Sequence, residues 1–188
     1  GALKLWSIRN GRITGGRQLE QRVGRITRIA LGRAADRDLL AVGSEDDVIT
    51  MWDVTDRDTP REVGRTSRLS EVIWAAAFTP DGAALAVGGT SGKVRLFDVR
   101  DPANPGLLAV STYDDDHVGS IMINEDSLMA LATGSGRIEL VDVRNPGAPA
   151  AVATLSGHER YVRTVDLAPD GTTLARGGLD RSVHIWEL

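Results

Sequence analysis

A repeat of about 45 residues is the feature that most constrains this chain of 188 residues. Five short segments share one pattern, in which aliphatic residues surround an anchor and an acidic residue usually follows it. The anchors are Trp6, Trp52, Phe97, Val141 and Trp186, at intervals of 46, 45, 44 and 45 residues. Self-similarity at such a period is typical of a propeller or another repeat architecture. The chain holds four periods plus eight residues, Gly1–Ile8, which duplicate Arg181–Leu188.

Each period contains the signals for four short strands and no helix. The first two apolar runs of the periods are Ile26–Leu31, Leu39–Gly43, Ile73–Phe78, Leu85–Gly89, Val118–Ile123, Leu128–Gly134, Val162–Leu167 and Leu174–Gly178. Turns such as Pro80-Asp81-Gly82 separate them, since Pro presets the first turn position and Gly accepts positive φ. The runs alternate weakly, which favours sheets covered on both faces. We therefore expect an all-β propeller of four-stranded antiparallel blades, forming a single domain over residues 1–188.

Composition excludes several classes of protein. With 41% hydrophobic and 26% charged residues the chain is predicted to fold, and the absence of Cys excludes disulfides, thiolate metal sites and a Cys nucleophile. A net charge of −4 argues against nucleic acid as a partner. Apolar runs are too short to span a membrane and no signal-peptide pattern occurs, so we expect a cytoplasmic protein without membrane contact.

The last repeat resembles the WD-repeat β-propeller family. It carries Gly157-His158 before its first strand, a Pro169-Asp170-Gly171 turn, and a Trp186-Glu187 ending. The resemblance covers essentially the whole chain and implies a rigid scaffold that binds a protein or peptide, with no catalytic activity and no cofactor. It also implies a buried hydrogen-bond network within a blade, and the matching residues are His158, Asp180 and Trp186 in the last repeat and Asp46 and Trp52 in an earlier one.

In that family, partners commonly dock on the face that carries the loops entering the innermost strands. The position just inside these strands is occupied by Thr27, Trp74, Gly119 and Arg163 in successive repeats, and nearby loop residues are Glu71, Asp116, Arg160 and Tyr161. Trp and Arg often dominate the energetics of interfaces. We therefore expect this face to bind the partner, while Trp74 wedged between blades remains an alternative.

Two motifs are candidates for a metal site and a phosphate-binding loop. The cluster Asp114–His117 lacks the pattern of a Ca²⁺ loop and is interpreted as a solvated acidic loop, with no metal site expected. The segment Gly88–Lys93 departs from a phosphate loop because Val94 follows Lys93 and no helix is expected there. The alternative function is a propeller enzyme that uses Asp114, Asp116 and Glu71 near the central channel, and a further alternative is a structural self-assembly unit.

The ends of the repeat raise the question of ring closure. The period predicts a partial first blade with third and fourth strands, three whole blades, and a last blade without its fourth strand. Unpaired edges and a bare face between blades are liabilities. We expect either a fragment of a longer propeller, a homodimer that closes an eight-bladed ring, or a strained four-bladed ring.

Overall fold

The structure is a computed structural model, and it describes residues 3–19, 24–34, 36–113, 116–156, 161–168 and 170–188. The described residues form antiparallel sheets and no helix. The strands are β1 (Leu3–Arg9), β2 (Arg12–Leu19), β3 (Ile26–Ala34), β4 (Arg37–Ser44), β5 (Ile49–Asp53), β6 (Arg61–Arg65), β7 (Ile73–Phe78), β8 (Ala84–Gly89), β9 (Lys93–Asp98), β10 (Gly106–Thr112), β11 (Val118–Ile123), β12 (Leu128–Thr133), β13 (Ile138–Asp142), β14 (Ala150–Leu155), β15 (Val162–Leu167), β16 (Thr173–Gly178) and β17 (Val183–Glu187).

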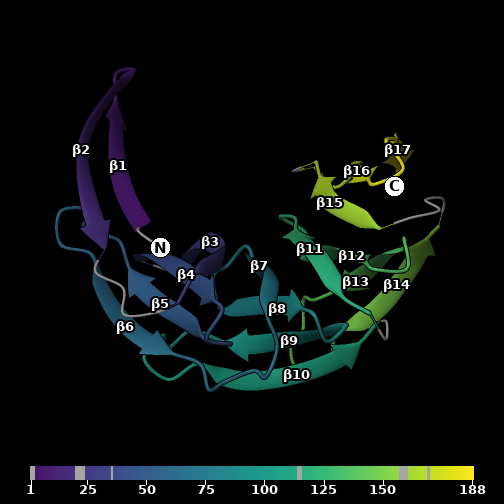
Figure 1. The fold of residues 1–188 in the computed structure, drawn as a ribbon, viewed down its shortest axis with the longest axis horizontal. Helices are drawn as coiled ribbons and strands as arrows, with labels where there is room; N and C mark the ends of the chain where they lie inside the picture. Colours follow the sequence, from purple (N-terminus) through teal and green to yellow (C-terminus); the bar gives the residue numbers. More distant parts are fainter. Residues whose placement is uncertain (1–2, 20–23, 35, 114–115, 157–160, 169) are drawn as a thin grey trace.

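The sheets follow the expected blades and are arranged around an open arc (Figure 1). The hairpin β1–β2 is followed by three four-stranded sheets, β3–β6, β7–β10 and β11–β14, and by the three-stranded sheet β15–β17. The five anchors of the repeat lie on β1, β5, β9, β13 and β17. The first strands of neighbouring blades, β3, β7, β11 and β15, pack side by side along the inner side of the arc. The fold class is therefore a β-propeller architecture whose sheets do not close into a ring.

The hydrophobic core lies between successive sheets. On β4, Leu39 and Ala41 pack toward the sheet β7–β10, whereas Leu40 and Val42 pack toward the hairpin β1–β2. Successive side chains of a strand point to opposite faces, so a strand between two neighbours must be apolar at every position. This explains the weak alternation of the sequence, and all six residues of β8 are buried.

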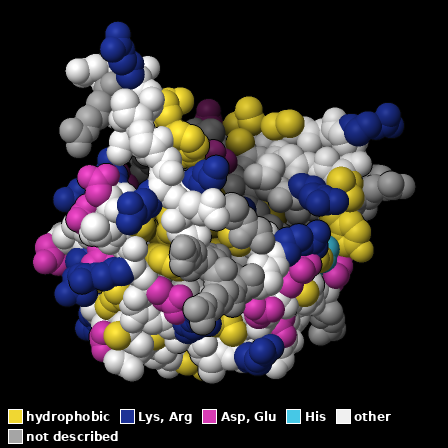
Figure 2. Space-filling model, turned by 60° about the vertical axis from the view of Figure 1, so that its left-hand side comes forward, with side chains coloured by type: hydrophobic (Ala, Val, Ile, Leu, Met, Phe, Trp, Pro, Cys, Tyr) yellow, Lys and Arg dark blue, Asp and Glu magenta, His cyan; other side chains and the backbone are white. Residues whose placement is uncertain are grey.

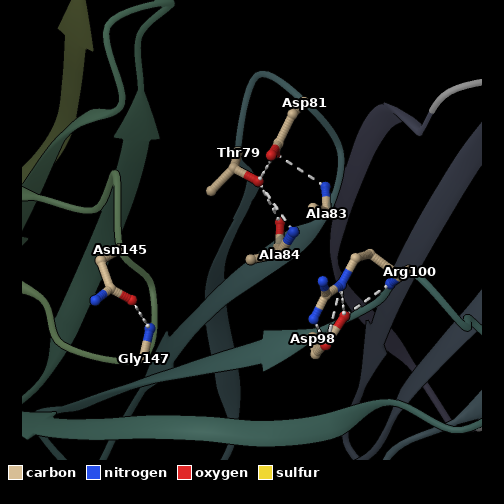
Figure 3. Close-up of polar contacts among 8 residues, drawn as sticks. All are labelled: Thr79, Asp81, Ala83, Ala84, Asp98, Arg100, Asn145 and Gly147. Atoms are coloured by element: carbon tan, nitrogen blue, oxygen red, sulfur yellow. Dashed lines mark hydrogen bonds and ion pairs between the residues drawn. The ribbon is translucent and has the colours of Figure 1, made fainter.

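The hairpin turns are held by short polar side chains (Figure 3). Thr79 donates its hydroxyl to Asp81 at 2.6 Å and accepts the backbone N–H of Ala84 at 3.0 Å. Gly82 has a φ of 66°, and a Cβ there would lie 2.2 Å from the carbonyl oxygen of Arg33, so the turn requires Gly. The degenerate turn of the next blade keeps this geometry with Ser127 at a φ of 60°.

The acidic residue after the anchor closes a second local motif. Asp98 accepts the backbone N–H of Arg100 at 3.0 Å and also binds its guanidinium (Figure 3). Asp142 and Arg144 repeat this arrangement one blade later. The guanidinium of Arg144 lowers the pKa of Asp142 from 3.8 to about 2.

Within the part of the chain that the structure describes, the hydrogen bonds expected around Trp52 are not formed. The indole N–H of Trp52 is buried without a hydrogen-bond partner among the described residues. Asp46 instead accepts the backbone N–H of Gly24 at 2.8 Å. That carboxylate is therefore used to hold the loop before β3, and the prediction for this repeat is wrong.

In the last repeat, the described contacts of Asp180 and Trp186 are made within the last sheet and the turn before its third strand. Asp180 accepts the backbone N–H of Ser182 at 3.0 Å and its hydroxyl at 2.7 Å. Trp186 stacks on His184, with ring centroids 5.3 Å apart, and lies beneath the guanidinium of Arg176. His158 lies outside the described residues, so its role stays a prediction. The described contacts of Trp186 are ring contacts to strand residues.

Candidate protein-binding site

A pocket of about 670 Å³ lies where the first strands of four blades meet. Its lining residues are Thr27, Trp74, Asp116, His117, Gly119, Tyr161, Val162, Arg163 and Leu179. The pocket therefore gathers the four repeat-equivalent positions, one each from β3, β7, β11 and β15. A concave, partly apolar surface of this volume is typical of a ligand site.

A β-bulge positions each of these four residues. In every blade the pairing of the first two strands skips one residue, and the skipped residues are Thr27, Trp74, Gly119 and Arg163. A bulge inserts one unpaired residue and re-aims its side chain away from the regular pleat. The residues on either side remain in register with the sheet, so the bulge explains how a strand can supply both the core and the pocket.

Three aromatic rings from three blades form one wall of the pocket. The imidazole of His117 lies between the indole of Trp74 and the phenol ring of Tyr161, with centroids 5.0 Å from each. Trp74 and Tyr161 keep 40% and 44% of their surface exposed. The alternative of a Trp74 buried between blades is therefore wrong, because its ring faces the pocket.

His117 is a pocket residue that the sequence pattern did not predict. The available signal was positional, because His117 and Tyr161 both stand two residues before a bulged position of their repeats. The acidic composition of the cluster Asp114–His117 predicts only a solvated loop and does not indicate that His117 is equivalent to Tyr161.

Asp116 fixes the orientation of His117. Its Oδ1 lies 2.8 Å from Nδ1 of the imidazole. The carboxylate packs closely over Gly134, where a Cβ would lie 2.3 Å from Oδ2. Gly134 also donates its backbone N–H to the carbonyl of His117 at 2.8 Å. The absence of a side chain at residue 134 thus leaves room for the Asp116–His117 pair directly before the start of β11.

Glu71 does not belong to the pocket, and its expected role in binding is wrong. Its side chain is buried, forms an ion pair with Arg95, and accepts the backbone N–H and hydroxyl of Ser91 at 3.1 and 2.7 Å. These partners are needed because burying a carboxylate without them costs several kcal/mol. Burial also lowers the pKa of Arg95. Arg160, another expected binding residue, lies outside the described residues.

The carboxylate site of the enzyme alternative does not assemble in the described part of the chain. Glu71 is buried with Arg95 and Asp116 is bonded to His117, while Asp114 lies outside the described residues. Within the described ranges no three His, Asp or Glu side chains come together in a group that could hold a metal ion. Those ranges also contain no helix long and apolar enough to cross a membrane.

The blades and the pocket on their inner strands define a protein of the β-propeller class. A family model described as "WD domain, G-beta repeat" matches residues 65–98 and 150–187. These two segments are similar to WD repeats, and the resemblance seen in the sequence is confirmed.

Two known proteins show how far this similarity extends. Protein groucho of Drosophila melanogaster is 28% identical over 142 residues, which are 74% of this chain and 19% of that protein. The chain thus spans less than a fifth of that relative's length. A chain of the crystal structure of the mitotic checkpoint complex is 24% identical, with a TM-score of 0.68 over 88% of this chain and 46% of the other. This structural likeness concerns the fold.

Proposed function

We propose that the protein is an interaction scaffold that holds a protein or peptide partner in the pocket lined by the four bulged residues. The observation that carries this proposal is that Thr27, Trp74, Gly119 and Arg163, from four successive blades, line one pocket. Exposed Trp, Tyr and Arg side chains are the types enriched where binding energy is concentrated.

The scaffold behind the pocket supports the same function. The residue before three of the bulges, Ile73, Val118 or Val162, is buried in the core between sheets, and Ile26 before the first bulge is partly buried. Binding residues attached to rigid elements lose little conformational freedom when a partner docks. WD repeats generally mediate contacts between proteins, and the structural neighbour belongs to a multi-protein complex.

Affinity capture with variants tests the proposed face. Trp74→Ala/Arg163→Ala removes two pocket side chains, and we expect it to lose the partners that the unchanged protein captures. Leu107→Ala/Arg12→Ala is the matched control, because both residues are exposed and lie away from the pocket on β10 and β2. Recovery of the same partners by the pocket variant would show that the face is wrong.

A second candidate function is self-assembly, with a second copy of the chain covering the open faces of the arc. Val183 and Ile185 on β17 are 72% and 70% exposed, and Trp6 and Ile8 are exposed on β1 at the other end. Figure 2 shows hydrophobic side chains exposed near the projecting end of the molecule and again across the opening. Apolar patches of this kind mark interaction surfaces.

Light scattering tests this assembly. A dimer has twice the chain mass of 20.1 kDa, and Ile185→Glu should return it to the monomer because a charge enters the apolar contact. Val110→Glu on β10 is the control at another exposed apolar side chain. A monodisperse monomer of the unchanged chain contradicts self-assembly and leaves the pocket proposal untouched.

A further inference from the structure

We infer that the three-ring wall and Asp116 bind a basic side chain, an ammonium or a guanidinium group, of the partner. This inference rests on the proposed function, since it names the chemistry of the group that enters the same pocket. It is carried by the rings of Trp74, His117 and Tyr161, by the carboxylate of Asp116, and by the hydrogen-bonding state of His117.

The rings offer electron-rich faces to a cation. Trp74 meets His117 edge to face, with an interplanar angle of 76°, and His117 meets Tyr161 at 45°. Rings inclined in this way do not stack face to face, and Trp74 and Tyr161 keep part of their surface exposed at the pocket. A cation over the face of Trp or Tyr is attracted by the ring quadrupole, and each exposed ring contributes about a two- to fivefold gain in affinity.

Asp116 and His117 add polar recognition. The carboxylate of Asp116 supplies negative charge at the rim, and its contact with Nδ1 places the imidazole proton on that nitrogen in the neutral ring. Nε2 is then an acceptor. It lies 3.9 Å from the position that a Cβ would occupy at Gly119, another pocket residue. An acceptor beside aromatic faces favours a cation with N–H groups over a quaternary ammonium.

Arg163 sets the opposing effect. Its side chain is exposed and lines the same pocket, so its charge repels a bound cation and would attract an anion. The rings and Asp116 favour the cation, and Arg163 weakens its binding. Removal of the Arg163 charge should therefore strengthen the binding of a basic group, whereas removal of a ring or of the Asp116 charge should weaken it.

Ligand-observed saturation-transfer NMR on the full chain tests this chemistry. The probes are N-acetyl-lysine methylamide, its uncharged analogue N-acetyl-norleucine methylamide, tetramethylammonium, and N-acetyl-glutamate methylamide. We expect saturable binding of the lysine probe at millimolar concentration, at least threefold weaker binding of norleucine and tetramethylammonium, and no saturable binding of glutamate. Equal binding of norleucine, tighter binding of glutamate, or no binding of lysine would overturn the inference.

Variants assign the effect to the pocket. Trp74→Leu, Tyr161→Leu and Asp116→Asn should each weaken the lysine probe about two- to fivefold, whereas Arg163→Gln should strengthen it about twofold or more. Leu107→Ala is the control, because Leu107 is also exposed but lies on β10 outside the pocket. Circular dichroism checks that each variant is folded. Weaker binding by Arg163→Gln contradicts the inference even if one ring variant fails to fold.

The two proposals fail separately. A pocket variant that captures the same partners contradicts the proposed face, whatever the probes do. Loss of partners by Trp74→Ala/Arg163→Ala supports the proposed binding face. Equal binding of the lysine and norleucine probes in the same protein would contradict only the inference that a basic group enters the pocket.

Discussion

The guanidinium carbon of Arg176 lies 4.2 Å from the ring centre of Trp186, on the neighbouring strand of the last sheet. Arg176 is almost fully buried and donates to the carbonyl oxygens of Gly136 and Leu155 at 3.3 and 3.4 Å. Both carbonyls belong to the preceding blade. One buried cation therefore joins a ring of its own sheet to the backbone of the preceding sheet, and burial lowers the pKa of Arg176.

Arg176→Ala should lower the free energy of unfolding by about 3 kcal/mol, because it leaves a cavity and two carbonyls without a donor. Arg176→Met should cost less, since it keeps the volume and removes a buried charge. Urea denaturation measures both, with Arg163→Ala on the exposed side of β15 as the control. Equal stability of Arg176→Ala and the unchanged protein would contradict a structural role for the contact.

The buried pair of Glu71 and Arg95 gives a second prediction. Arg95→Leu should destabilise the fold by about 3–5 kcal/mol, because it leaves the carboxylate of Glu71 buried without its cation. The double variant Glu71→Leu/Arg95→Leu should recover most of that loss. The control is Arg65→Leu, whose exposed pair with Glu62 is expected to contribute less than about 1 kcal/mol. A double variant no more stable than Arg95→Leu alone speaks against this account.

Acid should weaken the Asp142–Arg144 motif in a defined window. The pKa of Asp142 is lowered from 3.8 to about 2, so its contribution is complete above pH 3.8 and is lost as the pH falls through 2. Arg144→Gln should move the carboxyl titration of Asp142, followed by NMR, upward toward its ordinary value. An unchanged midpoint would show that Arg144 does not lower the pKa of Asp142.

Gly82→Ala should destabilise the hairpin between β7 and β8 by about 2 kcal/mol or more, since an L side chain at positive φ is strained and its Cβ meets the backbone of Arg33. Gly106→Ala is the control, because a Cβ at Gly106 has no neighbour within 4 Å. Thermal unfolding compares the two, and equal melting temperatures would contradict the prediction.

Most of the architecture could be predicted from the sequence because the repeat fixes it. The anchors Trp52, Phe97 and Val141 occupy the third strand of three whole blades despite their different chemistry. An aliphatic side chain at Val141 fills the same place between sheets as an aromatic one, so period carries more information here than residue type.

The site was predicted less completely, for two physical reasons. No sequence signal marks the bulges at Thr27 or Trp74, which depend on strand pairing. The burial of Glu71 depends on Arg95, 24 positions later on another strand, and a carboxylate in a loop resembles an exposed residue until that partner is in place.

The bulges also separate two demands that a small protein usually meets with the same residues. Buried residues in register, such as Ile73 on β7, Val118 on β11 and Val162 on β15, build the interior, while the four inserted positions, with residues as different as Gly119 and Trp74, line the pocket. On the proposed function, substitution at these four positions changes what the pocket recognises and leaves the buried residues in register beside them in place.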